Sequence, residues 1–193
     1  TSGKQFKKER KLYSSQKLFE SDVNPVFRCL ADNYLGADTP KLQQAFFDIE
    51  VDFDPEKGFA EPSDPFNPVT AISVHLDWIG KTICLVNKPK TLTKVDAQTI
   101  VDRFEDTILL DTEDELLETF LQLIDDADVM SGWNSEGFDI PYMVNRIARV
   151  LGKEHTRRFC LWGKYPNKRE FERYGKAQET YDTVGRLHLD YME

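Results

Sequence analysis

Two acidic side chains separated by one residue, Asp48 and Glu50, lie in a stretch of strand-forming residues at positions 45–51. Successive residues of a β-strand point to opposite faces of the sheet, so this spacing places both carboxylates on one face. They would lie roughly 6.5–7 Å apart along the strand, a separation that a divalent cation can bridge. Such pairs are also common on strands that simply face solvent, so the pair needs further ligands before it indicates a cation site.

A third carboxylate, Asp139, follows a later strand-like stretch, together with Asn134 and Phe138. An Asp at the beginning of a helix often serves only as a cap, and Asn and Gly before a helix often only form a turn. If Asp139 instead meets the other two acids, the three supply hard oxygen ligands of the kind that Mg²⁺ or Mn²⁺ prefers. Two such ions about 3.5–4 Å apart can promote hydrolysis of a phosphodiester near neutral pH.

The elements that would position these acids follow from the spacing of apolar residues. Alternation predicts strands, and recurrence every three or four residues predicts helices. The sequence predicts helical segments at 25–35, 112–124 and 140–151, and strands at 45–51, 69–78, 82–86, 128–131 and 186–191. The T-x-x-E pattern at 112–115 is typical of a capping box, which makes the acids at 113–115 structural. The proline-rich segment 53–68 is predicted to be a surface excursion that interrupts the sheet.

Composition sets the broad class. The chain has 193 residues, 40% of them hydrophobic, which predicts one main core, at 41–193, preceded by an arm and edge segment at 1–40. Its net charge is −9, and residues 1–17 hold six basic side chains against one acidic, so the remaining 176 residues carry a net charge of −14. No apolar run approaches the roughly 20 residues that cross a bilayer. The three cysteines form no C-x-x-C pair, so we expect a cytoplasmic protein without a disulfide framework.

Two strings of residues carry a resemblance to a known family. FDIE at 47–50, followed by GWNSEGFDIPY at 132–142, resembles the first two exonuclease motifs of family B DNA polymerases. The flanking strings LFESD at 18–22, FRCL at 27–30 and GRLHLD at 185–190 are also similar to that family. The resemblance spans about residues 18–191, and the spacing is most similar to the replicative polymerases of tailed phages.

The resemblance implies an α/β fold of the ribonuclease-H-like class, a mixed sheet flanked by helices, and 3′→5′ proofreading hydrolysis of DNA 3′ ends. It implies that Asp48, Glu50 and Asp139 are catalytic and bind two Mg²⁺ or Mn²⁺ ions, with Asp48 shared between them. Asn134 and Phe138 would position the terminal nucleotide. The expected partners are a single-stranded or frayed DNA end and the remaining polymerase domains, without a membrane, in the host cytoplasm if a phage encodes the protein.

One motif of the family has no counterpart here. Its third motif, Tyr-x-x-x-Asp, supplies a fourth carboxylate, and the only match, Tyr34 to Asp38, precedes the first motif. We therefore expect a domain truncated before that motif, with weak or no activity of its own. Asp190 and Glu193 are acidic, but their position fits the family's later strand, so neither is assigned as a ligand. Two alternatives remain: a non-catalytic DNA-binding or structural module of the polymerase, and an unrelated acidic metal-binding hydrolase.

A basic and aromatic region at 157–169 has no assigned role. The region contains five basic and two of its aromatic side chains in close succession: Arg157, Arg158, Trp162, Lys164, Tyr165, Lys168 and Arg169. A contact with DNA, a contact with a partner surface and plain solvation all fit such a composition.

Overall fold

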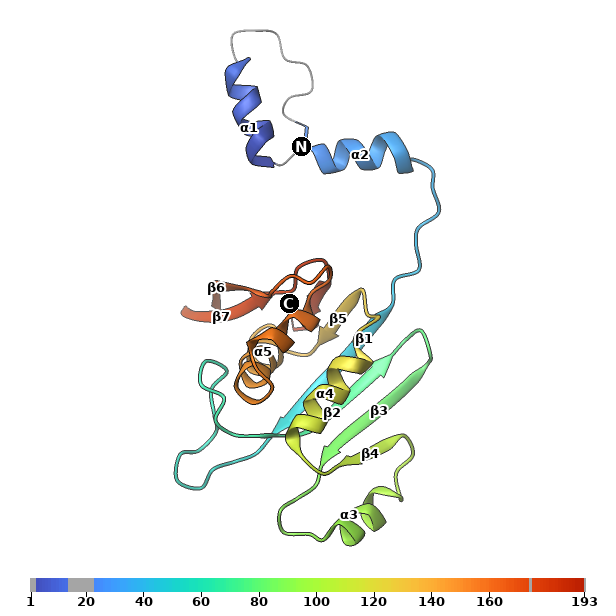
Figure 1. Ribbon diagram of the computed structural model, residues 1–193, viewed down its shortest axis with the longest axis vertical. Coiled ribbons are helices and arrows are strands. Elements are labelled where there is room, and N and C mark those ends of the chain that lie inside the picture. The colour runs from blue at the N-terminus through green and yellow to red at the C-terminus, as the bar shows by residue number, and fades with distance from the viewer. Residues whose placement is uncertain (1–2, 14–22, 174, 193) are drawn as a thin grey trace. The chain divides into compact units, whose positions relative to one another are not determined.

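The computed structural model describes residues 3–13, 23–173 and 175–192 (Figure 1). The flanking string at 18–22 and Glu193 lie outside these ranges. The chain divides into two compact units, Thr1–Lys41 and Leu42–Glu193. Among the described residues, no helix is long and apolar enough to cross a membrane.

The first unit contains two helices, α1 (Gly3–Leu12) and α2 (Pro25–Tyr34). The predicted helix at 25–35 is confirmed as α2. It begins where Asn24 accepts a hydrogen bond from the Val26 amide and Pro25 occupies the first turn, a position that needs no amide donor. Apolar side chains of α2 are exposed, and none of its residues is buried.

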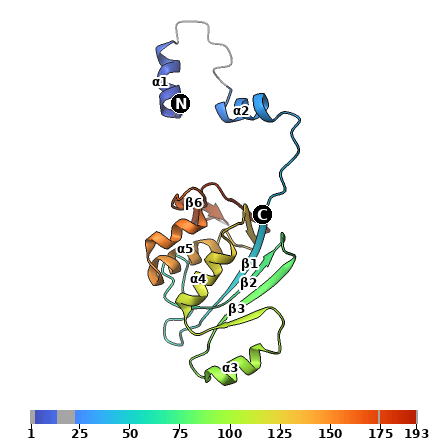
Figure 2. The same ribbon diagram turned by 45° about the vertical axis from the view of Figure 1, so that its right-hand side comes forward.

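The second unit is built on a six-stranded mixed sheet in the order β4-β3-β2-β1-β5-β8. Its strands are β1 (Gln44–Val51), β2 (Val69–Leu76), β3 (Lys81–Asn87), β4 (Thr107–Leu110), β5 (Val129–Gly132) and β8 (Leu187–Asp190). The strand pairing shows that β2 alone runs opposite to the other five. This mixed sheet with helices packed against it fits the predicted ribonuclease-H-like architecture (Figures 1 and 2).

The two faces of β1 differ as the alternation predicts. Phe47 and Ile49 are buried in the main core, where the Phe47 ring packs at 5.4 Å from the ring of Phe120. Asp48 and Glu50 point to the opposite face and are exposed. Helices α4 (Glu113–Leu123) and α5 (Asp139–Val150) contribute the buried apolar side chains on the first face, so the acids lie on the face that these helices leave open.

Helix α4 confirms the predicted start but modifies its cap. Thr112 accepts from the Glu115 amide at 3.4 Å, whereas the Glu115 carboxylate accepts from the amide of Asp111, one residue before the one a capping box uses. Glu113 is structural, as predicted. Its carboxylate is held by Arg146 of α5 at 2.7 and 2.6 Å and accepts from the Val69 amide at 2.8 Å.

The same guanidinium also orders the excursion at 53–68. Arg146 Nη1 donates to the carbonyls of Pro65 and Phe66 at 2.9 and 3.2 Å, and the segment contains two isolated β-bridges rather than regular strands. The Arg146–Glu113 pair therefore fixes the excursion to α4 and α5, together with hydrogen bonds from Tyr142 and Asn145 of α5 to the carbonyls of Asn67 and Pro62.

Several elements are additional to the predicted ones. They are helix α3 (Lys94–Val101), strand β4, the 3₁₀ helix η1 (Lys153–Phe159) and an antiparallel hairpin of β6 (Asn167–Arg173) and β7 (Lys176–Asp182). Part of the basic region at 157–169 thus lies in η1 and part in β6. The hairpin strands are largely charged, so they lack the apolar alternation that would have predicted them.

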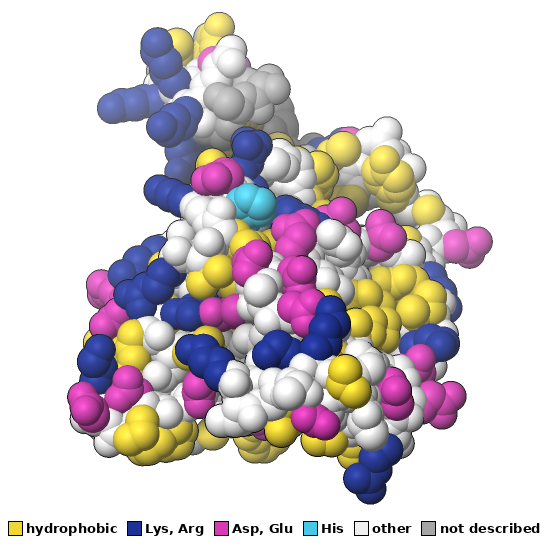
Figure 3. All heavy atoms as spheres, turned by 60° about the horizontal axis from the view of Figure 1, so that its bottom comes forward, with side chains coloured by type: hydrophobic (Ala, Val, Ile, Leu, Met, Phe, Trp, Pro, Cys, Tyr) yellow, Lys and Arg dark blue, Asp and Glu magenta, His cyan; other side chains and the backbone are white. Residues whose placement is uncertain are grey.

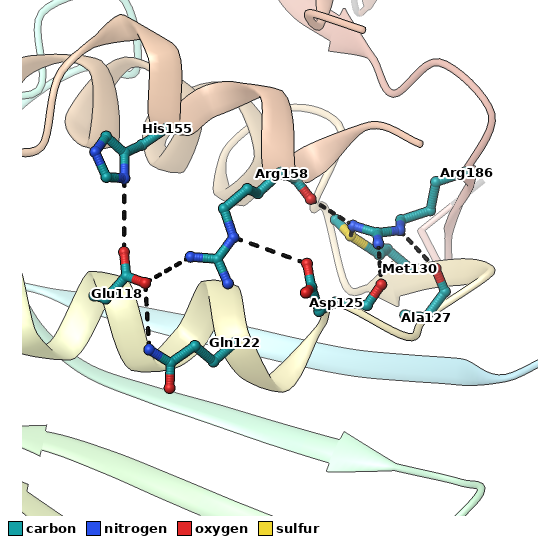
Figure 4. Close-up of polar contacts among 8 residues, drawn as sticks. All are labelled: Glu118, Gln122, Asp125, Ala127, Met130, His155, Arg158 and Arg186. Atoms are coloured by element: carbon teal, nitrogen blue, oxygen red, sulfur yellow. Dashed lines mark hydrogen bonds and ion pairs between the residues drawn. The ribbon is translucent and has the colours of Figure 1, made fainter. Parts of the chain in front are cut away.

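Arg186, one residue before β8, is buried and ties three segments together (Figure 4). Its guanidinium donates to the carbonyls of Ala127, Arg158 and Asp125 at 2.6, 2.8 and 2.9 Å. Two of these carbonyls follow the C-terminus of α4, where the helix dipole favours a cation. Burial lowers the pKa of Arg186, because it disfavours the charged guanidinium. The hydrogen bonds to the three main-chain carbonyls offset this cost of burying the charge.

We expect Arg186→Met to lower the free energy of unfolding by about 3 kcal/mol, because three buried carbonyls would each lose a bond worth about 1 kcal/mol. Urea unfolding followed by circular dichroism measures the change. The matched control is Arg149→Met, since Arg149 pairs with Asp64 at an exposed position, where an ion pair contributes about 0–1 kcal/mol. Equal losses in the two variants would contradict the anchoring role.

Candidate active site

The site begins where β1 and β5 separate. The two strands pair only from Gln44 to Phe46 on the β1 side. At the end of β5, Gly132 lies so close to β1 that a Cβ atom there would be 2.6 Å from the Phe47 carbonyl oxygen. Beyond this point the chain leaves the sheet, and the edge of β1 that carries the Ile49 amide becomes available to another partner.

That partner is Asp139, the first residue of α5. Its Oδ1 accepts a hydrogen bond from the Ile49 amide at 3.1 Å, and its side chain is only 4% exposed. Ile49 lies between the two acids of β1, so the third carboxylate is anchored at the backbone that carries them. The structure therefore brings Asp139 to the strand of Asp48 and Glu50, 90 residues away in sequence.

The electrostatics of Asp139 reflect this placement. Burial, and then the negative charge of Asp48, raise the pKa of Asp139 to about 7, while the Ile49 amide acts in the opposite direction. Asp190 contributes a smaller repulsion. Among the residues that the structure describes, no Lys or Arg forms an ion pair with Asp48, Glu50 or Asp139. The negative charge of the site is therefore not balanced by these side chains.

The acids do not form a closed ligand shell. Within the ranges 3–13, 23–173 and 175–192, no group of three or more His, Cys, Asp or Glu side chains is arranged to hold a metal ion. Asp48 and Glu50 lie on one face of β1, opposite Ser73 and Ala71 of β2, and both are exposed. Asp48 and Asp139 interact directly through their charges, whereas Glu50 is not among the charges that shift Asp139.

Asn134 and Phe138 shape the turn before α5. Asn134 adopts a left-handed backbone conformation with φ of 54°, and its carbonyl accepts from the amides of Gly137 and Phe138 at 3.1 and 3.0 Å. The Phe138 ring is half-buried and packs at 5.2 Å from the ring of Tyr142. Asn134 thus forms a turn, as the sequence left open, and Phe138 packs on Tyr142 directly before Asp139.

The loop that carries Asn134 is fastened to β8 by residues that sequence reasoning did not assign. Ser135 Oγ and His188 Nε2 are 2.8 Å apart, and burial lowers the pKa of His188. Asp190 accepts from the amide of Glu136 at 3.1 Å. The carboxylate of Asp190 therefore holds the loop at the main chain of Glu136. The string GRLHLD marked this strand, but no pattern indicated its contacts.

A second fastening joins the same loop to the β6–β7 hairpin. The Arg169 guanidinium forms ion pairs with Glu136 of the loop and with Asp182 of β7. Glu136 is buried, whereas Asp182 is exposed. The position of the loop before Asp139 therefore depends on the hairpin as well as on the sheet.

A groove of about 420 Å³ adjoins Asp48 on the open face of the sheet. Aromatic side chains dominate its lining, which consists of Phe46, Phe47, Asp48, Ser73, His75, Gly132, Trp133 and Tyr191. The rings of His75 and Tyr191 each lie about 6 Å from that of Phe46. A groove of this kind suits flat apolar groups next to a carboxylate.

The close approach of Gly132 to β1 leads to a prediction. We expect Gly132→Ala to lower the free energy of unfolding by about 2 kcal/mol, since the added methyl group would press on a backbone carbonyl that cannot rotate away. Gly137→Ala is the matched control: there the nearest atom, at 2.8 Å, is the side-chain oxygen of Asn134, which can move. Thermal unfolding of both variants distinguishes them, and a larger loss for Gly137→Ala would refute the argument.

Comparison with known proteins adds independent information. The family model of the DNA polymerase family B exonuclease domain matches residues 2–193. The DNA-directed DNA polymerase of Escherichia phage RB69 is 31% identical over 187 residues, covering 85% of this chain and 20% of that polymerase. That of Enterobacteria phage T4 is 34% identical over 85 residues, 43% of this chain and 9% of that protein. A DNA polymerase of Red sea bream iridovirus is 34% identical over 115 residues, 58% of this chain and 11% of that protein. The chain thus spans at most a fifth of the length of these relatives.

Proposed function

The chain belongs to the exonuclease-domain family of family B DNA polymerases, and from this premise we propose that it hydrolyses DNA from the 3′ end to nucleoside monophosphates. The observation that carries the proposal is the anchoring of Asp139 on the Ile49 amide, beside Asp48. Acids that repel one another and lack a basic partner among the described residues are an arrangement suited to divalent cations.

The residues present fit Mg²⁺ or Mn²⁺ in donor chemistry, because every candidate ligand is a carboxylate. Two such ions, when bound, would supply an activated water and neutralise the charge on the reacting phosphate. Asp48 would contact both ions, Glu50 one of them and Asp139 the other. The Ile49 amide holds Asp139 in place and favours its ionised form, which burial otherwise disfavours.

The remaining site residues would handle the DNA end. Asn134 lies in the turn before α5, and Phe138 directly precedes Asp139. The Phe138 ring would pack on a base or sugar. Contacts of this kind do not depend on sequence, as removal of any mispaired end requires. The aromatic groove beside Asp48 provides further room for a flat group.

A second candidate function is a non-catalytic module that binds DNA or supports the polymerase. It is favoured by the lack, among the described residues, of any three His, Cys, Asp or Glu side chains arranged to hold a metal ion. In that case the acids would remain as a family feature without sufficient ligands for hydrolysis.

One assay separates the two functions. The protein is incubated with Mn²⁺ and single-stranded DNA labelled at the 5′ end or, in parallel, at the 3′ end. Hydrolysis from the 3′ end gives a ladder from the first substrate and labelled mononucleotide from the second. Binding without shortening would reject the nuclease and support the non-catalytic module, and hydrolysis from the 5′ end would reject both.

The partners we propose are the DNA 3′ end and the remaining polymerase domains, in the cytoplasm of the cell where the polymerase works. Apolar side chains of α2 support the second partner. Val26, Phe27 and Tyr34 are each more than 60% exposed, and an exposed apolar helix face is typical of a surface that another domain covers.

A further inference from the structure

A patch of basic and aromatic side chains lies beyond the C-terminal end of α5, and we call it the 153–165 patch. It consists of Lys153, Arg157, Trp162, Lys164 and Tyr165, all of them exposed. The Trp162 side chain is 77% exposed, so its ring is accessible to a flat partner. The patch lies outside the site described above, because α5 alone spans about 18 Å from Asp139 to its last residue.

The fold fixes the aromatic part of the patch. Trp162 and Gly163 both adopt left-handed backbone conformations, with φ of 56° and 62°. Arg157 Nε donates to the Gly163 carbonyl at 3.0 Å and closes the turn. A Cβ atom at Gly185 would lie 2.7 Å from the Trp162 ring, so the indole rests directly on that glycine. One side of the ring therefore packs against the main chain at Gly185, while the rest of it is exposed.

The basic part of the patch is not neutralised. Arg158 turns inward to Glu118 and Asp125 (Figure 4), and Lys168 pairs with Glu179. By contrast, among the described residues no Asp or Glu pairs with Lys153, Arg157 or Lys164. Arg157 and Lys153 lie instead over the Tyr165 ring, at 5.3 and 6.0 Å from its centroid.

These unpaired cations stand out because the chain outside residues 1–17 carries a net charge of −14. On the face that Figure 3 shows, several acidic side chains gather near the middle, with basic and hydrophobic side chains around them. Three uncompensated cations within twelve residues, around two exposed rings, are the combination with which proteins bind a nucleic acid strand: cations for the phosphates and rings for the bases.

We infer that the 153–165 patch binds single-stranded DNA, with Lys153, Arg157 and Lys164 on the phosphates and a base stacked on Trp162. The inference rests on the proposed function for the choice of DNA as the ligand. An acidic protein would use the cations but would leave the exposed indole without a partner. The patch would hold the strand at a distance from the acids and lengthen the stay of DNA on the domain.

The test measures binding without hydrolysis. A fluorescein-labelled single-stranded oligonucleotide is titrated with the protein in EDTA at several salt concentrations, and anisotropy gives the Kd. Lys153→Gln with Lys164→Gln should weaken binding at least fivefold and reduce the slope of log K against log salt by about 1.4, since each contact with a single strand contributes about 0.7. The hydrogen bonds of Lys153 and Lys164 in this turn are made by their main chains, which the substitutions preserve, so the fold is retained, as circular dichroism will verify.

The matched control removes the same charge elsewhere. Lys90→Gln with Arg103→Gln changes two exposed cations of the same unit and should leave both the Kd and the salt slope unchanged. If the two double variants behave alike, or if the patch variant binds as tightly as the unmodified protein, the inference is wrong. Patch-dependent binding of labelled polyglutamate without any binding of DNA would assign the patch to an acidic protein and would equally overturn the inference.

A second measurement reports on the ring itself. In a Trp133→Phe background, which retains Trp78 and Trp162, DNA should quench part of the tryptophan fluorescence, and Trp162→Phe should abolish this quenching while weakening binding less than twofold. Trp162→Ala should weaken binding at least fivefold, because stacking of one base contributes about 1–3 kcal/mol. Patch-dependent binding without hydrolysis in Mn²⁺ would reject the proposed function and leave this inference standing. Hydrolysis in Mn²⁺ together with DNA binding that the patch substitutions leave unchanged would support the proposed function and reject this inference.

Discussion

Asp48→Ala is expected to lower the rate of Mn²⁺-dependent DNA shortening by about 10³-fold or more. Asp48 is exposed on the open face of β1, and its charge acts on Asp139 more strongly than that of Asp190. Its removal takes away the ligand proposed to be shared by both ions. A loss of about 4 kcal/mol of transition-state stabilisation corresponds to that factor. Single-turnover hydrolysis of end-labelled single-stranded DNA measures the rate.

The comparison among acids sharpens this prediction. Asp52→Asn removes a nearby exposed carboxylate that lies just beyond β1, and it should change the rate less than twofold. Glu50→Gln and Asp139→Asn should each reduce the rate strongly, because each removes one proposed ligand while preserving shape. Activity that survives Asp48→Ala, or that falls equally with Asp52→Asn, would show that these acids do not form the reacting centre.

Asp139→Asn is expected to stabilise the metal-free protein above pH 7. In the folded protein the pKa of Asp139 is raised from 3.8 to about 7, mainly by burial and by Asp48. A raised carboxyl pKa contributes stability that is fully present below about pH 4 and is lost as the pH rises through about 7. The variant carries no titrating group at this position, and its amide oxygen can still accept from the Ile49 amide.

The expected gain is on the order of 4 kcal/mol, from a shift of about three pKa units at about 1.4 kcal/mol each. Urea unfolding in EDTA at intervals between pH 4 and pH 8 should show the two proteins converging at the acidic end and separating towards neutrality. Mn²⁺ should reduce the difference at pH 8, since a bound cation favours the ionised acid. If the free energies of unfolding of the two proteins differ by the same amount at every pH in this range, the pKa of Asp139 is not raised in the folded protein.

Local sequence patterns were sufficient for the elements that carry the site. The alternation of apolar and acidic residues at 47–50 predicted that Asp48 and Glu50 share the face of β1 opposite to the core. The reason is that the apolar residues between them must face the core. The recurrence of apolar residues in α4 and α5 predicted both helices for the same reason. These are short-range regularities, and they depend on burial alone.

Contacts between distant segments were not accessible in this way. The bond from the Ile49 amide to Asp139 depends on where β5 stops pairing with β1, and hence on how closely Gly132 approaches Phe47. His188 carried no recognisable signal, since a histidine on a strand indicates its partner only after the strand has been placed. The family motifs identified Asp48, Glu50 and Asp139 as candidate ligands, but they did not give the distances between these side chains.

The pair of Glu113 and Arg146 has a consequence for the growing polypeptide. Arg146 follows Pro65, whose carbonyl it binds, by 81 residues. At about 5–20 residues per second, that separation corresponds to roughly 4–16 s on the ribosome. During this interval the proline-rich excursion lacks the guanidinium that orders it, so its native shape is acquired only after most of the domain has been synthesised.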